Sequence, residues 1–162
     1  KITKKKSEQN LGGLIGVPLI IGRKNFDSFP KQKPLPGRKN IVLTRDKNWK
    51  SKNPNENIIV FDCPWKALGY AEEKECAGDE LFIIGGEDIY VWYAKNIIVH
   101  RLYISFINAP NVKCDKFFPI ALLNLQRDYT VKEETRHKPD ENNAYGFTTR
   151  LYERKDFYLL LK

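Results

Sequence analysis

Two short basic segments are the parts of this chain best suited to bind an anion. Each follows directly after a short apolar run. Leu19–Ile21 leads into Gly22-Arg23-Lys24-Asn25, and Asn40–Leu43 leads into Thr44-Arg45. A guanidinium holds a phosphate or carboxylate in a bidentate fork, and a helix beginning after Gly22 would add the positive end of its dipole. Ligands of open α/β sheets bind at the carboxyl ends of strands, so we expect both basic segments to lie at one edge of the sheet and to bind an anion there.

Two other turns carry residue types that suit the same kind of site. Gly85-Gly86 separates an apolar run from a helix, and the missing Cβ atoms would let a ligand approach the backbone closely. The pattern is not G-x-G-x-x-G, which disfavours an ordinary Rossmann dinucleotide site. Arg38 follows a Pro36-Gly37 turn and could pair with a substrate carboxylate or with an acidic neighbour, and the sequence leaves both open.

The other residues capable of chemistry disfavour several enzyme classes. His100 and His137 lie in different settings and define no triad with a serine or cysteine, so a nucleophilic mechanism has no support. The three cysteines, Cys63, Cys76 and Cys114, form neither a metal-spaced pair nor a disulfide framework. We therefore expect no bound metal, and free thiols fit a reducing, cytoplasmic setting.

The composition fits one globular domain over residues 1–162, with 41% hydrophobic and 30% charged residues. The formal net charge of +8 has two interpretations, a lysine-rich solvated surface or attraction of anionic ligands. No basic recognition helix or known nucleic-acid module is present, so we expect no nucleic-acid partner. We expect no membrane association, because no apolar run approaches the roughly 18 residues of a membrane span and nothing resembles a signal peptide.

Strands and helices alternate over the first two thirds of the chain and must position these turns. The spacing predicts βαβ units and a mostly parallel sheet. The expected strands are Pro18–Ile21, Asn40–Leu43, Ile58–Phe61 and Leu81–Ile84, and the expected short helices are Asn25–Phe29 and Asp88–Ala94. A longer helix should run from an Asp62 N-cap to Glu75, with Trp65, Leu68 and either Tyr70 or Ala71 facing inward. The segment Trp49–Asn57 is predicted to be a polar loop.

The last third of the chain has a different character. Arg101–Ile107 is rich in strand-forming residues, and Cys114–Pro119 is expected to be a loop. Asp128–Glu134 and Phe147–Glu153 alternate as strands do, with the polar turn Lys138–Ala144 between them. They predict an antiparallel hairpin that completes the sheet, so the expected class is α/β with a mixed sheet.

Several blocks of the chain, taken together, resemble the dihydrofolate reductase family. They match it in order and spacing from Pro18 to Lys155, and this combination is specific although each block alone is weak. The blocks are Ile20–Ser28, Pro34–Arg45, Phe82–Tyr90, Arg101–Ser105, Asp115–Pro119 and Leu151–Lys155. The resemblance implies an α/β fold with a mostly parallel mixed sheet, flanking helices and a C-terminal antiparallel hairpin.

The resemblance also implies the activity, which is reduction of 7,8-dihydrofolate to tetrahydrofolate by hydride transfer from NADPH. The implied cofactor-binding positions are Gly22, Arg23, Lys24, Asn25, Leu43, Thr44, Arg45, Ile84, Gly85, Gly86, Glu87, Asp88, Ile89 and Tyr90. The implied positions for folate and antifolate-type ligands are Ser28, Phe29, Leu35, Arg38, Ile84 and Ser105. Within these sets the family has a cis peptide at Gly85-Gly86, an adenosine 2′-phosphate beside Thr44-Arg45, and the folate glutamate carboxylate on Arg38. Ser105 matches a hydroxyl residue that hydrogen-bonds the catalytic acid.

The chain departs from the family at its start. The family begins with a strand, a loop containing Leu-Pro-Trp, and a helix bearing the Asp or Glu that promotes protonation of the pterin. None of these precedes Lys1-Ile2-Thr3, which resembles the end of that helix. Two accounts stay open: the chain is a fragment of a longer reductase, or the natural chain lacks the segment and is not a competent reductase.

Other functions remain as alternatives. A riboflavin-pathway pyrimidine reductase resembles this fold, but the Pro34–Arg38 turn and the Phe117–Pro119 block favour the folate enzyme. A non-catalytic, nucleotide-binding remnant of the fold is another alternative. We expect a monomer or a fusion to thymidylate synthase, whose linker would follow Lys162.

Overall fold

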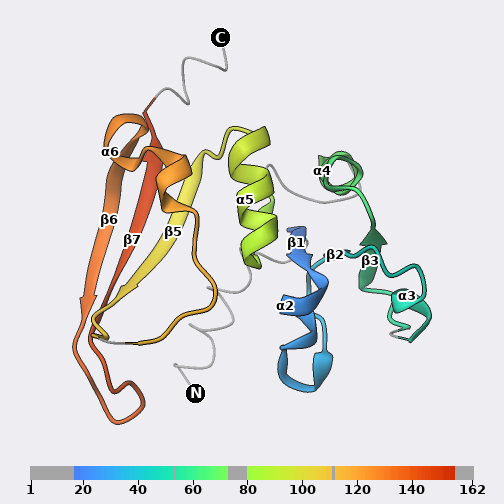
Figure 1. Ribbon diagram of the computed structural model, residues 1–162, viewed down its shortest axis with the longest axis horizontal. Helices are drawn as coiled ribbons and strands as arrows, with labels where there is room; N and C mark the ends of the chain where they lie inside the picture. Colours follow the sequence, from blue (N-terminus) through green and yellow to red (C-terminus); the bar gives the residue numbers. More distant parts are fainter. Residues whose placement is uncertain (1–16, 53, 73–79, 111, 156–162) are drawn as a thin grey trace. The chain divides into compact units, whose positions relative to one another are not determined.

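The computed structural model describes residues 17–52, 54–72, 80–110 and 112–155 (Figure 1). The chain divides after Tyr90 into two compact units, and each has its own sheet. The predicted helix end at Glu75 and the thiol of Cys76 lie outside the described residues. No helix in the described ranges combines the length and apolar character needed to cross a bilayer.

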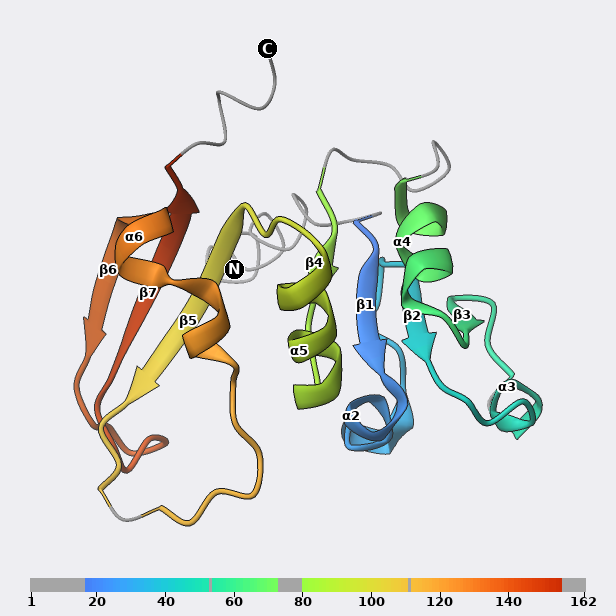
Figure 2. The ribbon, with the colours of Figure 1, turned by 45° about the horizontal axis from the view of Figure 1, so that its top comes forward.

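The first unit is built on a four-stranded parallel sheet in the order β3-β2-β1-β4 (Figure 2). The strands are β1 (Leu19–Gly22), β2 (Asn40–Leu43), β3 (Ile58–Phe61) and β4 (Phe82–Ile83). The segments between them contain α2 (Arg23–Asp27), the 3-10 turn η1 (Pro30–Gln32), α3 (Trp49–Lys52) and α4 (Pro64–Glu72). Gly22 pairs with Leu43 and Leu43 with Phe61, so three strands end at the same level.

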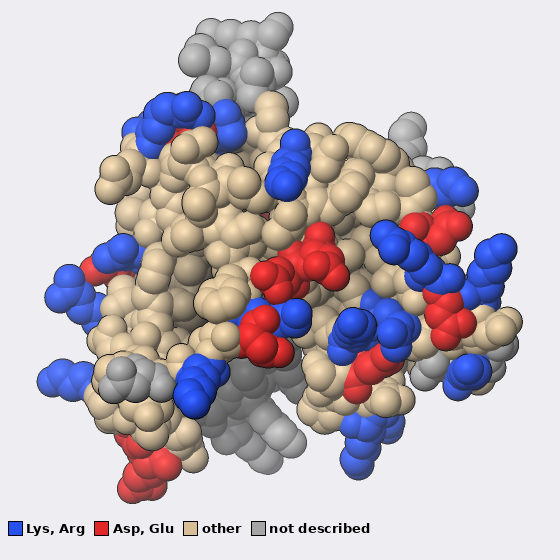
Figure 3. Space-filling model, viewed as in Figure 1, with Lys and Arg blue, Asp and Glu red and all other residues tan. Residues whose placement is uncertain are grey.

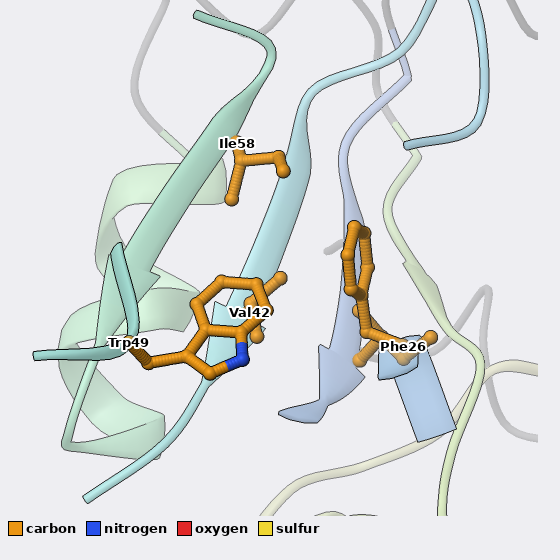
Figure 4. Packing of buried hydrophobic residues seen from close by; sticks show 5 residues of the cluster. Phe26, Val42, Trp49 and Ile58 are labelled. Carbon is orange, nitrogen blue, oxygen red and sulfur yellow. The ribbon is translucent and has the colours of Figure 1, made fainter. Parts of the chain in front are cut away.

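A compact aromatic cluster covers one face of this sheet. It joins Phe26 of α2 and Trp49 of α3 to three strand residues, Ile21, Val42 and Ile58 (Figure 4). The rings of Phe26 and Trp49 meet edge to face, with 5.4 Å between centroids. The cluster holds α2, with its Arg23, against the carboxyl ends of the strands.

Two alanines of α4 pack toward the opposite face. Ala67 and Ala71 are buried one turn apart, and the Tyr70 ring lies 5.6 Å from the Phe61 ring of β3. Trp65 is 53% exposed, so the prediction that it faces inward is wrong. The side of α4 that meets the sheet is therefore the one that carries Ala67 and Ala71.

Two further details of the first unit differ from prediction. Trp49 begins α3 and is only 4% exposed, although the sequence predicts a polar loop from Trp49 to Asn57. Its large apolar area draws the start of a lysine-rich segment into the core. At α4 the Cys63 carbonyl accepts from the Ala67 N–H at 3.1 Å, so Cys63 rather than Asp62 lies at the N-cap.

The second unit contains a three-stranded antiparallel sheet in the order β5-β7-β6. Its elements are β5 (Arg101–Ile107), η2 (Ile120–Leu123), α6 (Leu125–Asp128), β6 (Tyr129–His137) and β7 (Phe147–Arg154). The chain boundary between the units falls inside α5 (Glu87–Asn96). One face of the sheet packs Leu102, Tyr129 and Tyr152 against Leu123, and the alternation along β5 leaves its other face open.

The predicted α/β class is confirmed, and the predicted bounds of β2, β3 and β5 match the structure. The first short helix begins at Arg23 rather than Asn25, and η2 and α6 lie where we predict no helix. In the described residues the strands form a parallel and a separate antiparallel sheet, whereas the sequence predicts one mixed sheet. The β6–β7 hairpin forms as predicted, with a register shift between Val131 and Glu133.

Candidate functional site

The turns that follow β1, β2 and β4 meet at the carboxyl edge of the first unit's sheet. The Gly22 N–H donates to the Gly85 carbonyl at 2.6 Å, which joins the end of β1 to the turn after β4. The Thr44 N–H donates to the Phe61 carbonyl at 3.0 Å and extends the β2–β3 ladder beyond β2. The structure thus brings three of the predicted turns to one edge (Figure 2).

The turn after β4 requires glycine. The peptide between Gly85 and Gly86 is cis, as the family resemblance implies. Gly85 has φ +104°, and a Cβ there would lie 2.9 Å from Tyr90 Cε2 and 3.1 Å from Asn25 Nδ2. The Asn25 amide also donates to the Ile84 carbonyl at 2.9 Å, which ties α2 to the same turn. The missing Cβ of buried Gly85 therefore makes room for Tyr90 and Asn25, whereas half-buried Gly86 has only the Asn25 Cβ nearby, at 3.9 Å.

Arg23 is held by a chain of two side-chain contacts. Its Nη1 donates to Asp27 Oδ2 at 2.9 Å, one turn along α2. The other carboxylate oxygen, Oδ1, accepts from the Trp49 indole N–H at 3.2 Å. The core tryptophan thus orients Arg23 through one carboxylate, and that carboxylate compensates part of the arginine's charge. Lys24, the next residue, is exposed.

Arg45 lies in an exposed turn that local polar contacts define. Thr44 Oγ1 accepts from the Asp46 N–H at 3.1 Å, and Asp46 Oδ1 accepts from the Asn48 N–H at 2.9 Å. These contacts are typical of ST- and Asx-turns. Within the described residues, no hydrogen bond or ion pair engages the Arg45 guanidinium, so its full charge is available to an anion.

Arg38 lies in the turn on the other side of β2. Arg38 and Leu35 are both half-buried, and the buried side chain of Asn40 binds the backbone of each. The described residues give the Arg38 guanidinium no ion pair, so the alternative of a salt bridge to an acidic neighbour gains no support from them.

Ser28 and Phe29, two predicted folate positions, follow α2 directly. Ser28 Oγ donates to the Asn25 carbonyl at 2.6 Å and closes the end of the helix. The ring of Phe29 lies 5.5 Å from that of Phe26, so it extends the aromatic cluster beyond the end of α2. Leu43 is buried at the end of β2. Phe29 adds apolar surface next to exposed Ser28, whereas Leu43, the residue after Val42, points to the other face of the sheet.

The first turn of α5 supplies the remaining cofactor positions predicted in this unit. Glu87 and Asp88 lie there, and their carboxylates suit the positive end of the helix dipole. The same carboxylates would repel a phosphate placed directly at this helix start, so we expect phosphates nearer the basic turns. Ile89 packs closely against Gly22: a Cβ added to Gly22 would lie 3.0 Å from Cγ1 of Ile89. Burial raises the pKa of the Tyr90 hydroxyl, which keeps it neutral at physiological pH.

Ser105 lies in the second unit, on the exposed face of β5 and opposite Thr149 of β7. Its neighbours on that face, Tyr103 and Ile107, are 62% and 64% exposed. The same unit has a hollow of about 720 Å³ lined by residues of η2, α6 and all three strands. No predicted site residue lines this hollow, so the sequence prediction gives it no role.

Three residues of the site were missed from the sequence: Asp27, Asn40 and Trp49. Each had a signal that could have identified it. Asp27 lies four residues after Arg23, the spacing of a helical ion pair, and Asn40 is a polar residue opening an otherwise apolar strand. Trp49 is a large apolar residue within a run of lysines and polar residues.

On one face of the molecule, charge lies in local groups rather than in a continuous patch. On the face shown in Figure 3, lysines and arginines form separate groups with aspartates and glutamates between them. In the described part of the chain, no cluster of three His, Cys, Asp or Glu side chains could hold a metal ion.

Comparison with known proteins agrees with this geometry. The sequence model of the family described as "Dihydrofolate reductase" matches residues 13–154. The chain is 34% identical to dihydrofolate reductase of Staphylococcus haemolyticus, over 86% of this chain and 74% of that protein. It is 32% identical to dihydrofolate reductase of Lactococcus lactis, over 84% of this chain and 74% of that protein.

A third relative is a fusion protein. The bifunctional dihydrofolate reductase-thymidylate synthase of Zea mays is 32% identical over 62% of this chain and 20% of its own length. The family match covers most of the sequence and includes all the turns that meet at the sheet edge. This chain therefore belongs to the dihydrofolate reductase family, whose members are NADPH-dependent oxidoreductases that reduce dihydrofolate.

Proposed function

We propose that the carboxyl edge of the first unit's sheet binds NADPH through its three turns. Arg45, which has no ion pair among the described residues, would take the adenosine 2′-phosphate together with Thr44. Arg23 and Lys24 would take the pyrophosphate, with Arg23 already oriented by Asp27. The residues present suit this group, because two basic turns supply charge and a turn of bare glycine backbone lies between them and α5.

Dihydrofolate, on this proposal, lies along the surface that follows α2. Phe29, Leu35 and Ile84 would contact its rings, and Ser28 would border them. The guanidinium of Arg38 would hold the glutamate carboxylate at the far end of the substrate. The observation that carries this assignment is the Arg38 turn, whose backbone is fixed while its guanidinium has no partner in the described residues. Antifolates of similar shape would occupy the same surface.

The two ligands divide the work of the reaction. NADPH, when bound, supplies the hydride that reduces the pterin, and a proton completes tetrahydrofolate. The contribution of the first unit is to bind and orient, which brings the two reacting rings together without new solvent reorganisation. The glycine turn would permit close approach to the backbone, and neutral Tyr90 would add no charge beside the ring system.

We assign the proton-promoting carboxylate to none of the described residues. Asp27 is already engaged by Arg23 and by the Trp49 indole, so it suits a structural role. The family resemblance implies a carboxylate on an N-terminal helix, with Ser105 as its hydrogen-bond partner. Ser105 is exposed on its strand face, which is consistent with a role as hydrogen-bond partner of that carboxylate.

We further propose that both units belong to one dihydrofolate reductase-like domain, because the family model spans residues of both. A monomer and a fusion like that of the maize relative both fit this proposal. The free thiols of Cys63 and Cys114 fit a cytoplasmic location.

Steady-state assay of the full natural protein tests the proposal. We expect NADPH to be oxidised only when dihydrofolate is present. The loss of NADPH absorbance measures the oxidation. A matched reaction with folate-free buffer measures any background oxidation. Absence of turnover with the full protein would contradict the proposed assignment, and the binding of NADPH alone would then favour the remnant.

A further inference from the structure

Asn40 is a polar residue in the apolar core of the first unit. Among the described residues it is the one buried polar side chain, and it is 0% exposed. Its Oδ1 accepts from the Leu35 N–H at 2.9 Å. Its Nδ2 donates to the carbonyl of Leu35 and to the carbonyl of Arg38, each at 3.0 Å. One acceptor and two donors are thus all used on the turn before β2.

The backbone of Asn40 is fixed as firmly as its side chain. Its N–H donates to the Asn57 carbonyl at 3.0 Å, and its residue pairs with Leu19 and Ile58 in the parallel sheet. Between Leu35 and Asn40 the chain turns through Gly37, which has φ +69°. The side chain therefore ties the turn that carries Arg38 to the central sheet.

We propose that Asn40 is a positioning residue for substrate, which holds the Arg38 turn so that the guanidinium meets the folate glutamate carboxylates in a fixed orientation. This inference rests on the proposed role of Arg38. A bidentate arginine–carboxylate pair depends on angle as well as distance, so a loose turn would weaken it without removing any charge. Asn40 touches neither ligand and acts only through Arg38 and Leu35.

The proposal predicts that a change at Asn40 weakens binding only of the glutamate tail of the substrate. In the full protein, Asn40→Ser shortens the side chain beyond reach of the turn while keeping a small polar group. We expect the KM for dihydrofolate to rise roughly 10-fold, since one to two charge-assisted hydrogen bonds are misaligned. The kcat at saturation and the KM for NADPH should change by less than about 2-fold on the same argument.

A substrate pair separates positioning from a simple loss of folded protein. The probe is a dihydrofolate analogue whose glutamate carboxylates are replaced by uncharged carboxamides. The ratio of kcat/KM between dihydrofolate and this analogue does not depend on how much enzyme is active. We expect the ratio to fall in Asn40→Ser, to fall at least as far in Arg38→Ala, and to fall no further in the double variant.

Asn57→Ser is the matched control, because Asn57 is an exposed asparagine at the entry to neighbouring β3. It should leave the ratio unchanged. If Asn40→Ser slows both substrates equally while Arg38→Ala lowers the ratio, Asn40 is only structural and this inference is overturned. If Arg38→Ala leaves the ratio unchanged in an active enzyme, the proposed role of Arg38 fails and the inference fails with it. An inactive wild-type protein would contradict the proposed function itself.

Discussion

The two turns that flank β2 carry the two arginines of the proposed site, and they are built in opposite ways. The turn before the strand is tied down by a fully buried side chain, with three hydrogen bonds from Asn40 to Leu35 and Arg38. The turn after the strand is defined by Thr44 and Asp46, whose contacts are short-range and exposed. One strand thus has a turn with a fixed backbone at its start and a turn held only by short-range, exposed contacts at its end.

The difference suits the two anions that the site is proposed to bind. A carboxylate is planar, so it binds an arginine more strongly when the guanidinium is held at the angle of a bidentate pair. A phosphate presents acceptor oxygens in several directions and tolerates an arginine that adjusts. A fixed backbone at Arg38 and a less constrained turn at Arg45 are therefore expected if the first binds a carboxylate and the second a phosphate.

The largest effect should come from removing the buried clamp. Asn40→Leu fills the same space but leaves the N–H of Leu35 and two carbonyls without partners. We expect a loss of about 3 kcal/mol in the free energy of unfolding, since buried unpaired groups cost about 1–3 kcal/mol each and some will reach water. Urea denaturation of the full protein measures it, and an unchanged midpoint would contradict the account of this turn.

An intermediate effect is expected at the far end of the second turn. Trp49→Phe keeps an aromatic ring beside Phe26 but removes the N–H that binds Asp27. We expect a loss of about 1 kcal/mol from the missing hydrogen bond, plus some lost packing from the smaller ring. Thermal or urea unfolding gives the value. A loss as large as that of Asn40→Leu would show that the second turn is anchored as firmly as the first.

The smallest effect should come from the exposed turn itself. Asp46→Ala removes the side-chain acceptor of the Asn48 N–H, which solvent can replace. We expect the free energy of unfolding to change by no more than about 0.5 kcal/mol. Equal destabilisation by Asp46→Ala and Asn40→Leu, measured side by side, would remove the contrast between the two turns.

Much of the fold was predictable because its strands are short, continuous apolar runs bounded by glycine, proline or charge. β2 and β3 have the predicted bounds for this reason, and β5 has them because it is rich in strand-forming residues. Helix faces were less predictable, since α4 offers both Trp65 and the Ala67–Ala71 pair as candidates for burial. Ala67 and Ala71 are buried while Trp65 is 53% exposed, and the local pattern did not show which side of the helix would meet the sheet.

The turns of the site were predictable from residue types, but their supports were not. Glycine and arginine at Gly22-Arg23 and Gly85-Gly86 stand out in the sequence, and the structure joins them at one edge. The contacts of Asp27 with Trp49 and of Asn40 with Leu35 depend on how the chain folds back. A one-dimensional pattern shows which residues are polar, but it does not show which backbone groups they will meet.

Ligand binding by two matched variants tests most directly whether β2 separates the two anion sites. Dissociation constants for NADPH and dihydrofolate are measured by titration of the full protein carrying Arg38→Ala or Arg45→Ala, with NADH as a cofactor lacking the 2′-phosphate. We expect Arg38→Ala to weaken dihydrofolate about 10- to 100-fold and to leave NADPH within about 2-fold. Arg45→Ala should weaken NADPH about 10-fold while sparing both NADH and dihydrofolate. If both variants lose the same ligand equally, the assignment of one anion to each turn is wrong.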